Sequence, residues 1–72
     1  MTIQDILGIT EDKVYIMDEA RAFAVIAKFT EDSSQAEVDY TLKQIYEMTV
    51  KDIKASDGDL ILTVNTLEED KA

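Results

Sequence analysis

The side chains with the most potential for chemistry in this chain are its carboxylates, because sixteen of the 72 residues are Asp or Glu and none is His or Cys. The commonest general base and the most nucleophilic side chain are therefore missing. A pair of carboxylates can still catalyse hydrolysis, but it needs a substrate cleft and one acid whose pKa is raised by burial. The acids here fall at turns, helix caps and helix flanks, where side chains are solvated. We expect that the chain is not an enzyme.

Metal and cofactor sites are equally unfavoured by the residue types. Zinc sites are built mainly from imidazole and thiolate ligands. The run Asp57-Gly58-Asp59 might suggest calcium, but a calcium-binding loop of the EF-hand type needs acids at alternating positions, a later Gly and a terminal Glu, and only fragments of that pattern are present. With two glycines in all, Gly8 and Gly58, the chain has no glycine-rich phosphate loop. We expect no metal and no cofactor.

Composition bounds the remaining possibilities. The formal net charge of −9 repels nucleic acid and anionic membranes, so a basic protein is the complementary partner. No stretch approaches the roughly 20 apolar residues that span a bilayer, and the first residues lack the basic segment of a signal peptide. Together with the absence of Cys, this predicts a cytoplasmic protein with one domain over residues 1–66 and a flexible acidic tail over residues 67–72.

The first half of the chain predicts a short helix and two strands. Thr2 and Asp5 have the spacing of a capping box, and Gly8 can end that helix in the left-handed conformation. Alternating apolar residues predict strands over residues 13–17 and 22–29, joined by a polar turn. The second of these is rich in Ala, and a helix capped by Asp18 is the alternative for it.

The second half predicts one long helix and a hairpin. Ser34 and Glu37 form a second capping box, and residues of one apolar stripe recur at helical spacing after it (Val38, Leu42, Ile45 and Met48 or Thr49). The Asp57-Gly58 pair favours a two-residue turn, which sets Ala55 opposite Leu60 and Ile53 opposite Leu62. The alternative for residues 49–55 is a continuation of the helix.

The predicted fold is therefore α+β: a short N-terminal helix followed by ββαββ, giving a four-stranded, mainly antiparallel sheet with one main helix on one face. The strand over residues 22–29 is apolar on both faces, so its second face needs cover. Either the N-terminal helical turn or a second copy of the protein can supply that cover. Because the core of so short a chain is also thin, we expect a homodimer.

Acidic residues gather around the predicted helix, the hairpin turn and the tail, whereas the predicted strands are nearly neutral. One interpretation is that these acids only keep a small protein soluble. The functional interpretation is that spaced carboxylates imitate the phosphates of a nucleic acid and bind Arg and Lys in the same way. The predicted partner-binding residues are Glu31, Asp32, Glu37, Asp39, Glu47, Asp57, Asp59, Glu68, Glu69 and Asp70.

In its length, its charge and its lack of His, Cys, Pro and Trp, the chain resembles the small DNA-mimic proteins with which bacteriophages disable host factors. Targets of that group include histone-like nucleoid proteins such as HU, RNA polymerase and CRISPR nucleases. The resemblance implies an inhibitor of a host nucleic-acid-binding protein, with an HU-like nucleoid protein as the first candidate. Because DNA mimics share no fold or motif, it assigns no role to any single residue.

A rival hypothesis places function on apolar residues. A structural or regulatory module could bind its partner through the uncovered sheet face, with Tyr15, Met17 and Ile26 as contacts and the acids serving solubility alone.

Overall fold

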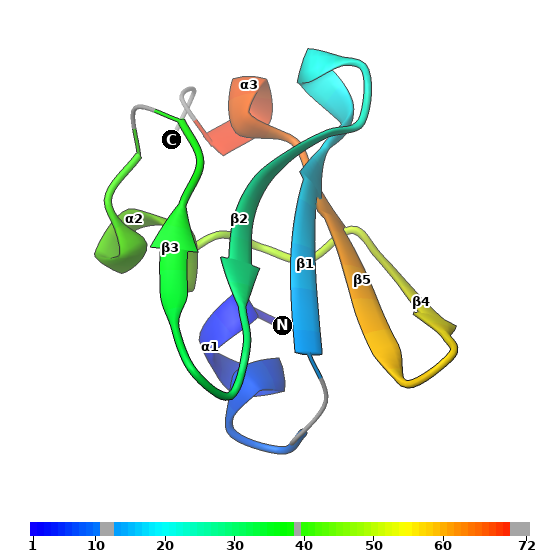
Figure 1. The fold of residues 1–72 in the computed structure, drawn as a ribbon. Helices are drawn as coiled ribbons and strands as arrows, with labels where there is room; N and C mark the ends of the chain where they lie inside the picture. The colour runs from blue at the N-terminus through cyan, green and yellow to red at the C-terminus, as the bar shows by residue number, and fades with distance from the viewer. Residues whose placement is uncertain (11–12, 39, 70–72) are drawn as a thin grey trace.

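The computed structural model describes residues 1–10, 13–38 and 40–69 (Figure 1). They form an α+β fold with a five-stranded, mainly antiparallel sheet and short helices, where the sequence predicted four strands. In chain order the elements are α1 (Ile3–Leu7), β1 (Lys13–Asp18), the 3₁₀ turn η1 (Glu19–Arg21), β2 (Ala24–Phe29), β3 (Ser34–Ala36), α2 (Leu42–Tyr46), β4 (Asp52–Ser56), β5 (Asp59–Val64) and α3 (Thr66–Glu69).

The strand order in the sheet is β3-β2-β1-β5-β4. The neighbours β3 and β2, β2 and β1, and β5 and β4 are antiparallel, but β1 and β5 at the centre are parallel. The parallel pair requires a crossover, which the chain makes after α2 by passing behind the sheet to reach β4 (Figure 1). The predicted ββαββ order is therefore corrected to βββαββ. The additional strand is β3, which lies at one edge of the sheet.

The helix predicted from Ser34 is wrong. Residues 34–36 form β3, in which Ser34 pairs with Phe29 and Ala36 with Ala27 of β2. The helix begins later, where Thr41 caps α2 by accepting a hydrogen bond from the Gln44 amide at 3.2 Å. Gln44 in turn accepts from the Thr41 amide at 2.8 Å. Both segments fit a capping box, and pairing with β2 decides between them.

The predictions for the first and last elements are mostly confirmed. The Thr2–Asp5 capping box is present, and its hydrogen bonds, the backbone bond first, lower the pKa of the Asp5 carboxyl below its ordinary 3.8. Gly8 was expected to adopt the left-handed conformation, but its φ is −74° and its backbone is right-handed. Residues 24–29 and 52–56 are strands and not helix. The predicted tail begins inside α3, and residues 70–72 lie outside the described part of the chain.

The core fills the face of the sheet that α1 and α2 cover. Ile3 and Ile6 of α1 and Ile45 of α2 pack with Ile16 and Leu62 from the two central strands, and all are buried. Ile45 and Met48 keep the core positions that the apolar pattern predicted, although α2 is only five residues long. No helix of the described residues lies on the opposite face of the sheet, which turns toward the viewer in Figure 1.

A β-bulge in β2 changes which residues reach the core. Ile16 pairs with Ala27 but Met17 pairs with Val25, so Ile26 is an extra residue in the ladder. Ile26 and Ala27 are both buried, while Val25 is 39% exposed on the other face. Simple alternation placed Ile26 on the uncovered face, and that placement is wrong because the bulge shifts the register by one residue.

Candidate functional site: the acidic end of the sheet

Two turns from distant parts of the sequence lie at the same end of the sheet. Val14 pairs with Phe29, and Lys13 pairs with Asp59, so the end of β2 and the start of β5 both flank the start of β1. The β2–β3 turn and the β4–β5 turn therefore project from one end, the lower end in Figure 1. The first turn carries Glu31 and Asp32, and the second carries Asp57 and Asp59. We call these four residues together the acidic end.

The β2–β3 turn is closed by its own hydrogen bonds. The Thr30 amide donates to the Ser33 carbonyl at 2.8 Å, and the Ser33 amide donates to Thr30 Oγ1 at 3.2 Å. The two residues between them, Glu31 and Asp32, are consequently held at the tip and are exposed. A turn fixed in this way presents its carboxylates with little conformational freedom left to lose on binding.

The β4–β5 turn is the two-residue hairpin that the sequence predicted. Asp57 and Gly58 both have positive φ, 47° and 86°, as a type I′ turn requires. The predicted register is confirmed, because Ala55 pairs with Leu60 and Ile53 with Leu62. Asp57 is exposed at the tip and Asp59 is half-buried at the start of β5.

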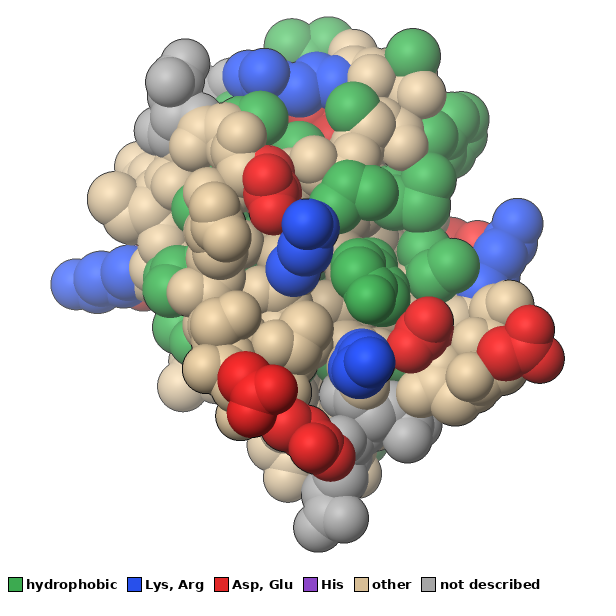
Figure 2. Space-filling view, in the orientation of Figure 1, with side chains coloured by type: hydrophobic (Ala, Val, Ile, Leu, Met, Phe, Trp, Pro, Cys, Tyr) green, Lys and Arg blue, Asp and Glu red, His purple; other side chains and the backbone are tan. Residues whose placement is uncertain are grey.

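The four carboxylates of the acidic end form no ion pair with another residue of the described ranges 1–10, 13–38 and 40–69. Figure 2 shows two separate groups of acidic side chains along this edge, with a basic side chain between them. The two turns are three strand spacings apart in the sheet order, which is about 14 Å. The end therefore carries two pairs of free carboxylates at a fixed separation.

The other predicted partner-binding residues do not join this group. Glu37 follows β3 and pairs with Lys28 at 3.2 Å, and Glu47 ends α2. Glu68 lies in α3 near the opposite end of the sheet, where it pairs with Lys51. Glu69 is the last residue of α3, and Asp39 and Asp70 lie outside the described residues.

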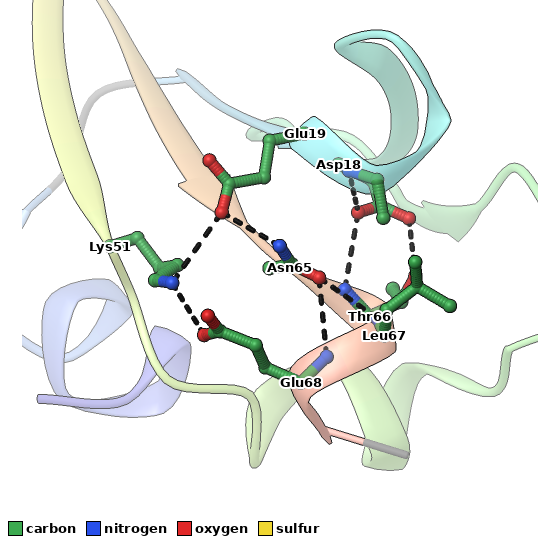
Figure 3. A network of polar contacts seen from close by, with 8 residues as sticks. Asp18, Glu19, Lys51, Asn65, Thr66, Leu67 and Glu68 are labelled. Carbon is green, nitrogen blue, oxygen red and sulfur yellow. Dashed lines mark hydrogen bonds and ion pairs between the residues drawn. The ribbon is translucent and has the colours of Figure 1, made fainter. Parts of the chain in front are cut away.

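At the opposite end of the sheet, acids are part of a hydrogen-bonded network (Figure 3). Asp18 is fully buried; its Oδ1 accepts from the amides of Ala20 and Thr66 at 2.9 and 3.2 Å, and its Oδ2 accepts from Thr66 Oγ1 at 2.6 Å. Arg21 Nε lies 3.5 Å from Asp18 Oδ2. We call this end the network end, and it consists of Asp18, Glu19, Arg21, Lys51, Asn65, Thr66 and Glu68.

The second half of the network end joins η1, the residue before β4 and the start of α3. Asn65 donates to Glu19 at 2.9 Å and caps α3 by accepting from the Leu67 and Glu68 amides at 3.0 and 3.2 Å. Lys51 pairs with Glu19 at 3.5 Å and with Glu68. The hydrogen bond to Glu68, the largest cause, raises the pKa of the Lys51 ammonium above its ordinary 10.5.

Sequence reasoning did not find the network end. The available signal was Asn65, which stands three residues before Glu68 with the spacing of a capping box. The hydrogen-bonded pair Asp18 and Thr66 is separated by 48 residues in the chain, so no local pattern connects the two.

The uncovered face of the sheet is the second surface of note. Tyr15, Met17 and Ile61 are half-buried there and Val25 is 39% exposed; we call these four residues the open face. Figure 2 shows hydrophobic side chains gathered on this side. Ile26, predicted to lie there, is in the core instead.

Across the described residues the surface has no pocket, and no group of three or more Asp or Glu side chains is arranged to hold a metal ion. No helix in the same residues is long and apolar enough to cross a membrane. Comparison with known protein families, curated proteins and solved structures finds no match to this chain.

Proposed function

We propose that this chain inhibits a basic nucleic-acid-binding protein in the cytoplasm by occupying that protein's DNA-binding surface with the acidic end. The observation that carries the proposal is the gathering of four unpaired carboxylates from two hydrogen-bonded turns at one end of the sheet. An HU-like nucleoid protein is the first candidate partner, on the compositional resemblance to phage DNA mimics.

The physical argument rests on charge and spacing. Arg and Lys bind carboxylates much as they bind phosphates, with short, charge-assisted hydrogen bonds. The two acidic turns are about 14 Å apart, which is of the order of the width of a DNA major groove, about 12 Å. A basic surface shaped to contact phosphates on both sides of a groove can therefore contact both turns at once.

Rigidity and net charge support the same assignment. Both turns are anchored in the sheet, so binding does not have to order a flexible acidic segment. The net charge of −9 also attracts a basic partner from a distance and repels nucleic acid itself.

The test is displacement of duplex DNA from a purified HU-like protein, and the fluorescence anisotropy of labelled DNA measures its release. We expect the chain to release DNA at about 0.05 M salt. Because added salt alone dissociates DNA from a basic protein, the salt dependence is measured on direct binding of the labelled chain to the HU-like protein without DNA, and this binding should weaken as salt rises to about 0.5 M. Direct binding that is insensitive to salt, or no release of DNA at any concentration of the chain, would refute the proposal.

Two double variants locate the site. Glu31→Gln with Asp32→Asn, and Asp57→Asn with Asp59→Asn, each remove two charges from one turn, and each should weaken binding by about 10-fold. Asn also suits the positive φ of residue 57. The matched control, Glu37→Gln with Glu47→Gln, removes the same charge elsewhere and should bind within about 2-fold of the unmodified chain. Equal effects from all three would show that only net charge matters.

A second candidate function, a structural or regulatory protein-interaction module, is favoured by the open face, since α1 and α2 pack on the other side of the sheet. Its partner would be bound by Tyr15, Met17, Val25 and Ile61. Val25→Lys places a charge on this face and should abolish such binding while leaving DNA displacement intact. The reverse result, with displacement lost in Val25→Lys, would move the site from the acidic end to the open face.

A further inference from the structure

The edge strand β4 is the longer free edge of the sheet. It pairs with β5 on one side, and no strand of the described residues pairs with its other side. All five of its side chains are exposed, including Ile53 at 47%. The opposite edge, β3, has only three residues. An exposed edge of this length is a template for a further strand.

The hairpin geometry decides which backbone groups point outward from β4. In a two-residue hairpin, the residues that flank the turn exchange both of their hydrogen bonds, and here these are Ser56 and Asp59. Alternation along the strand then directs the N–H and C=O groups of Lys54 and Asp52 toward β5 as well. The N–H and C=O groups of Ile53 and Ala55 therefore point outward.

From this edge we infer that β4 pairs with β4 of a second copy of the chain, antiparallel and about a two-fold axis at Ile53. In that register the outward N–H and C=O of Ile53 bond to those of Ile53 in the second copy. Asp52 then lies opposite Lys54 of the second copy, and the same ion pair forms again on the other side of the axis. The strand is therefore complementary to itself in charge.

Charge also discriminates against the neighbouring register. A two-fold axis at Lys54 would bring the two Lys54 side chains directly opposite each other, which is destabilising. Shifting the axis to Ala55 moves Lys54 opposite Ser56 and leaves both Asp52 side chains without a cation. The register centred on Ile53 is the one in which every charged side chain of β4 meets its opposite.

The dimer would be a continuous ten-stranded sheet, and its antiparallel pairing would direct the two acidic ends away from each other. A contact of one short strand per copy is below the area of a standard protein interface, so we expect a dissociation constant on the order of tens of micromolar. Each copy carries a net charge of −9, so the two copies repel each other at long range. Salt at about 0.3 M screens most of this repulsion.

The experiment is sedimentation equilibrium at about 0.3 M salt, from about 1 to 1,000 µM protein, on the unmodified chain and three β4 variants. Lys54→Asp and Asp52→Lys each create two like-charge contacts, so each should weaken dimerisation by at least about 10-fold. Combining both exchanges restores opposite charges across the axis with unchanged composition, and should return dimerisation to within about 3-fold. Circular dichroism confirms that each variant is folded, which is expected because both positions are exposed.

Asp52→Lys separates pairing from net charge. It makes the chain less negative, so general repulsion alone predicts stronger association, whereas loss of the ion pair predicts weaker association. Glu47→Lys, at the end of α2, changes the net charge identically and should not weaken the dimer.

A monomer at all concentrations, single variants that associate like the unmodified chain, or a double exchange that fails to recover would each overturn the inference. The dimer is independent of the acidic end, so Asp57→Asn with Asp59→Asn should leave it intact. Failure of DNA displacement with an intact dimer would reject the proposed function alone.

Discussion

The two ends of the sheet use the same residue type in opposite ways. At the network end, Asp18 accepts a hydrogen bond from Thr66 of α3 and is fully buried. Glu19 accepts a hydrogen bond from Asn65 and forms an ion pair with Lys51, which precedes β4. At the acidic end, Glu31, Asp32 and Asp57 are exposed and have no cation paired with them in the described part of the chain. Acids at the network end therefore hold the fold together, whereas those at the acidic end remain available to another molecule.

The largest effect should come from Asp18→Ala. The substitution leaves the Thr66 amide and hydroxyl buried without their acceptor, and we expect a loss of about 3 kcal/mol in the free energy of unfolding. Urea denaturation measures it, with Thr66→Val, which removes the hydroxyl bond alone, as a milder variant near 1 kcal/mol. A loss under about 1 kcal/mol for Asp18→Ala would show that the network end is not structural.

Both ends of the sheet contain residues with positive φ, and substitutions there should have opposite effects on stability. Gly58 has a φ of +86° at the acidic end, and a Cβ there would meet no atom within 4 Å. Gly58→Ala should therefore cost only the left-handed penalty, less the entropy regained in the unfolded chain, for a net loss of about 1 kcal/mol. A thermal or urea unfolding curve measures the loss, and an unchanged curve would mean that the turn relaxes to another type.

At the network end the left-handed positions are not glycines. Ala22 and Phe23 have φ values of 56° and 61° after η1. Ala22→Gly should relieve that strain and stabilise the fold by about 0.5 kcal/mol, the opposite sign to Gly58→Ala. Differential scanning calorimetry can resolve the rise in Tm, and a fall would show that Ala22 makes contacts worth more than its strain.

Neutralising acids at the acidic end should barely change stability. Asp57→Asn with Asp59→Asn removes two charges that form no ion pair, so the free energy of unfolding should stay within about 0.5 kcal/mol of the unmodified value. The same variant should bind the partner about 10-fold more weakly, as described above. A large destabilisation would mean that these acids are structural, and the contrast between the ends would disappear.

The smallest effect should be the pH dependence of Lys51. Its pKa is raised in the folded state, chiefly by the hydrogen bond to Glu68, so its contribution is complete below pH 10.5 and is lost as the pH rises through the folded value. Because 36% of its side chain is exposed, the effect should be slight. Urea midpoints between pH 8 and about 11.5 should fall less steeply in Glu68→Gln than in the unmodified chain; parallel curves would exclude the coupling.

Local patterns predicted the elements whose geometry is set by adjacent residues. Asp57-Gly58 determined both the turn type and the register of the last hairpin, and Thr2 with Asp5 determined the start of α1. The helix expected from Ser34 failed because pairing of residues 34–36 with β2 overrides the helix preference of Gln35 and Ala36.

Long-range arrangement was beyond local patterns. Glu31 and Asp57 lie at the same end of the sheet because β1 lies between β2 and β5. No sequence pattern near either residue encodes that strand order. The bulge that buries Ile26 likewise arises from pairing with β1. The acids of the site were therefore identifiable by type, but their grouping, and the exclusion of Glu37 and Glu68, required the sheet topology.

The parallel pairing of β1 with β5 has a consequence for synthesis of the chain. Lys13 pairs with Asp59 and Asp18 with Val64, so the two central strands cannot meet until residue 64 has left the ribosome. Until then, the inner edge of β1 and the apolar side chains of α1 remain without their final neighbours. We expect the nascent chain to fold late and in one step, and a pause in translation before β5 would prolong its exposure to chaperones and proteases.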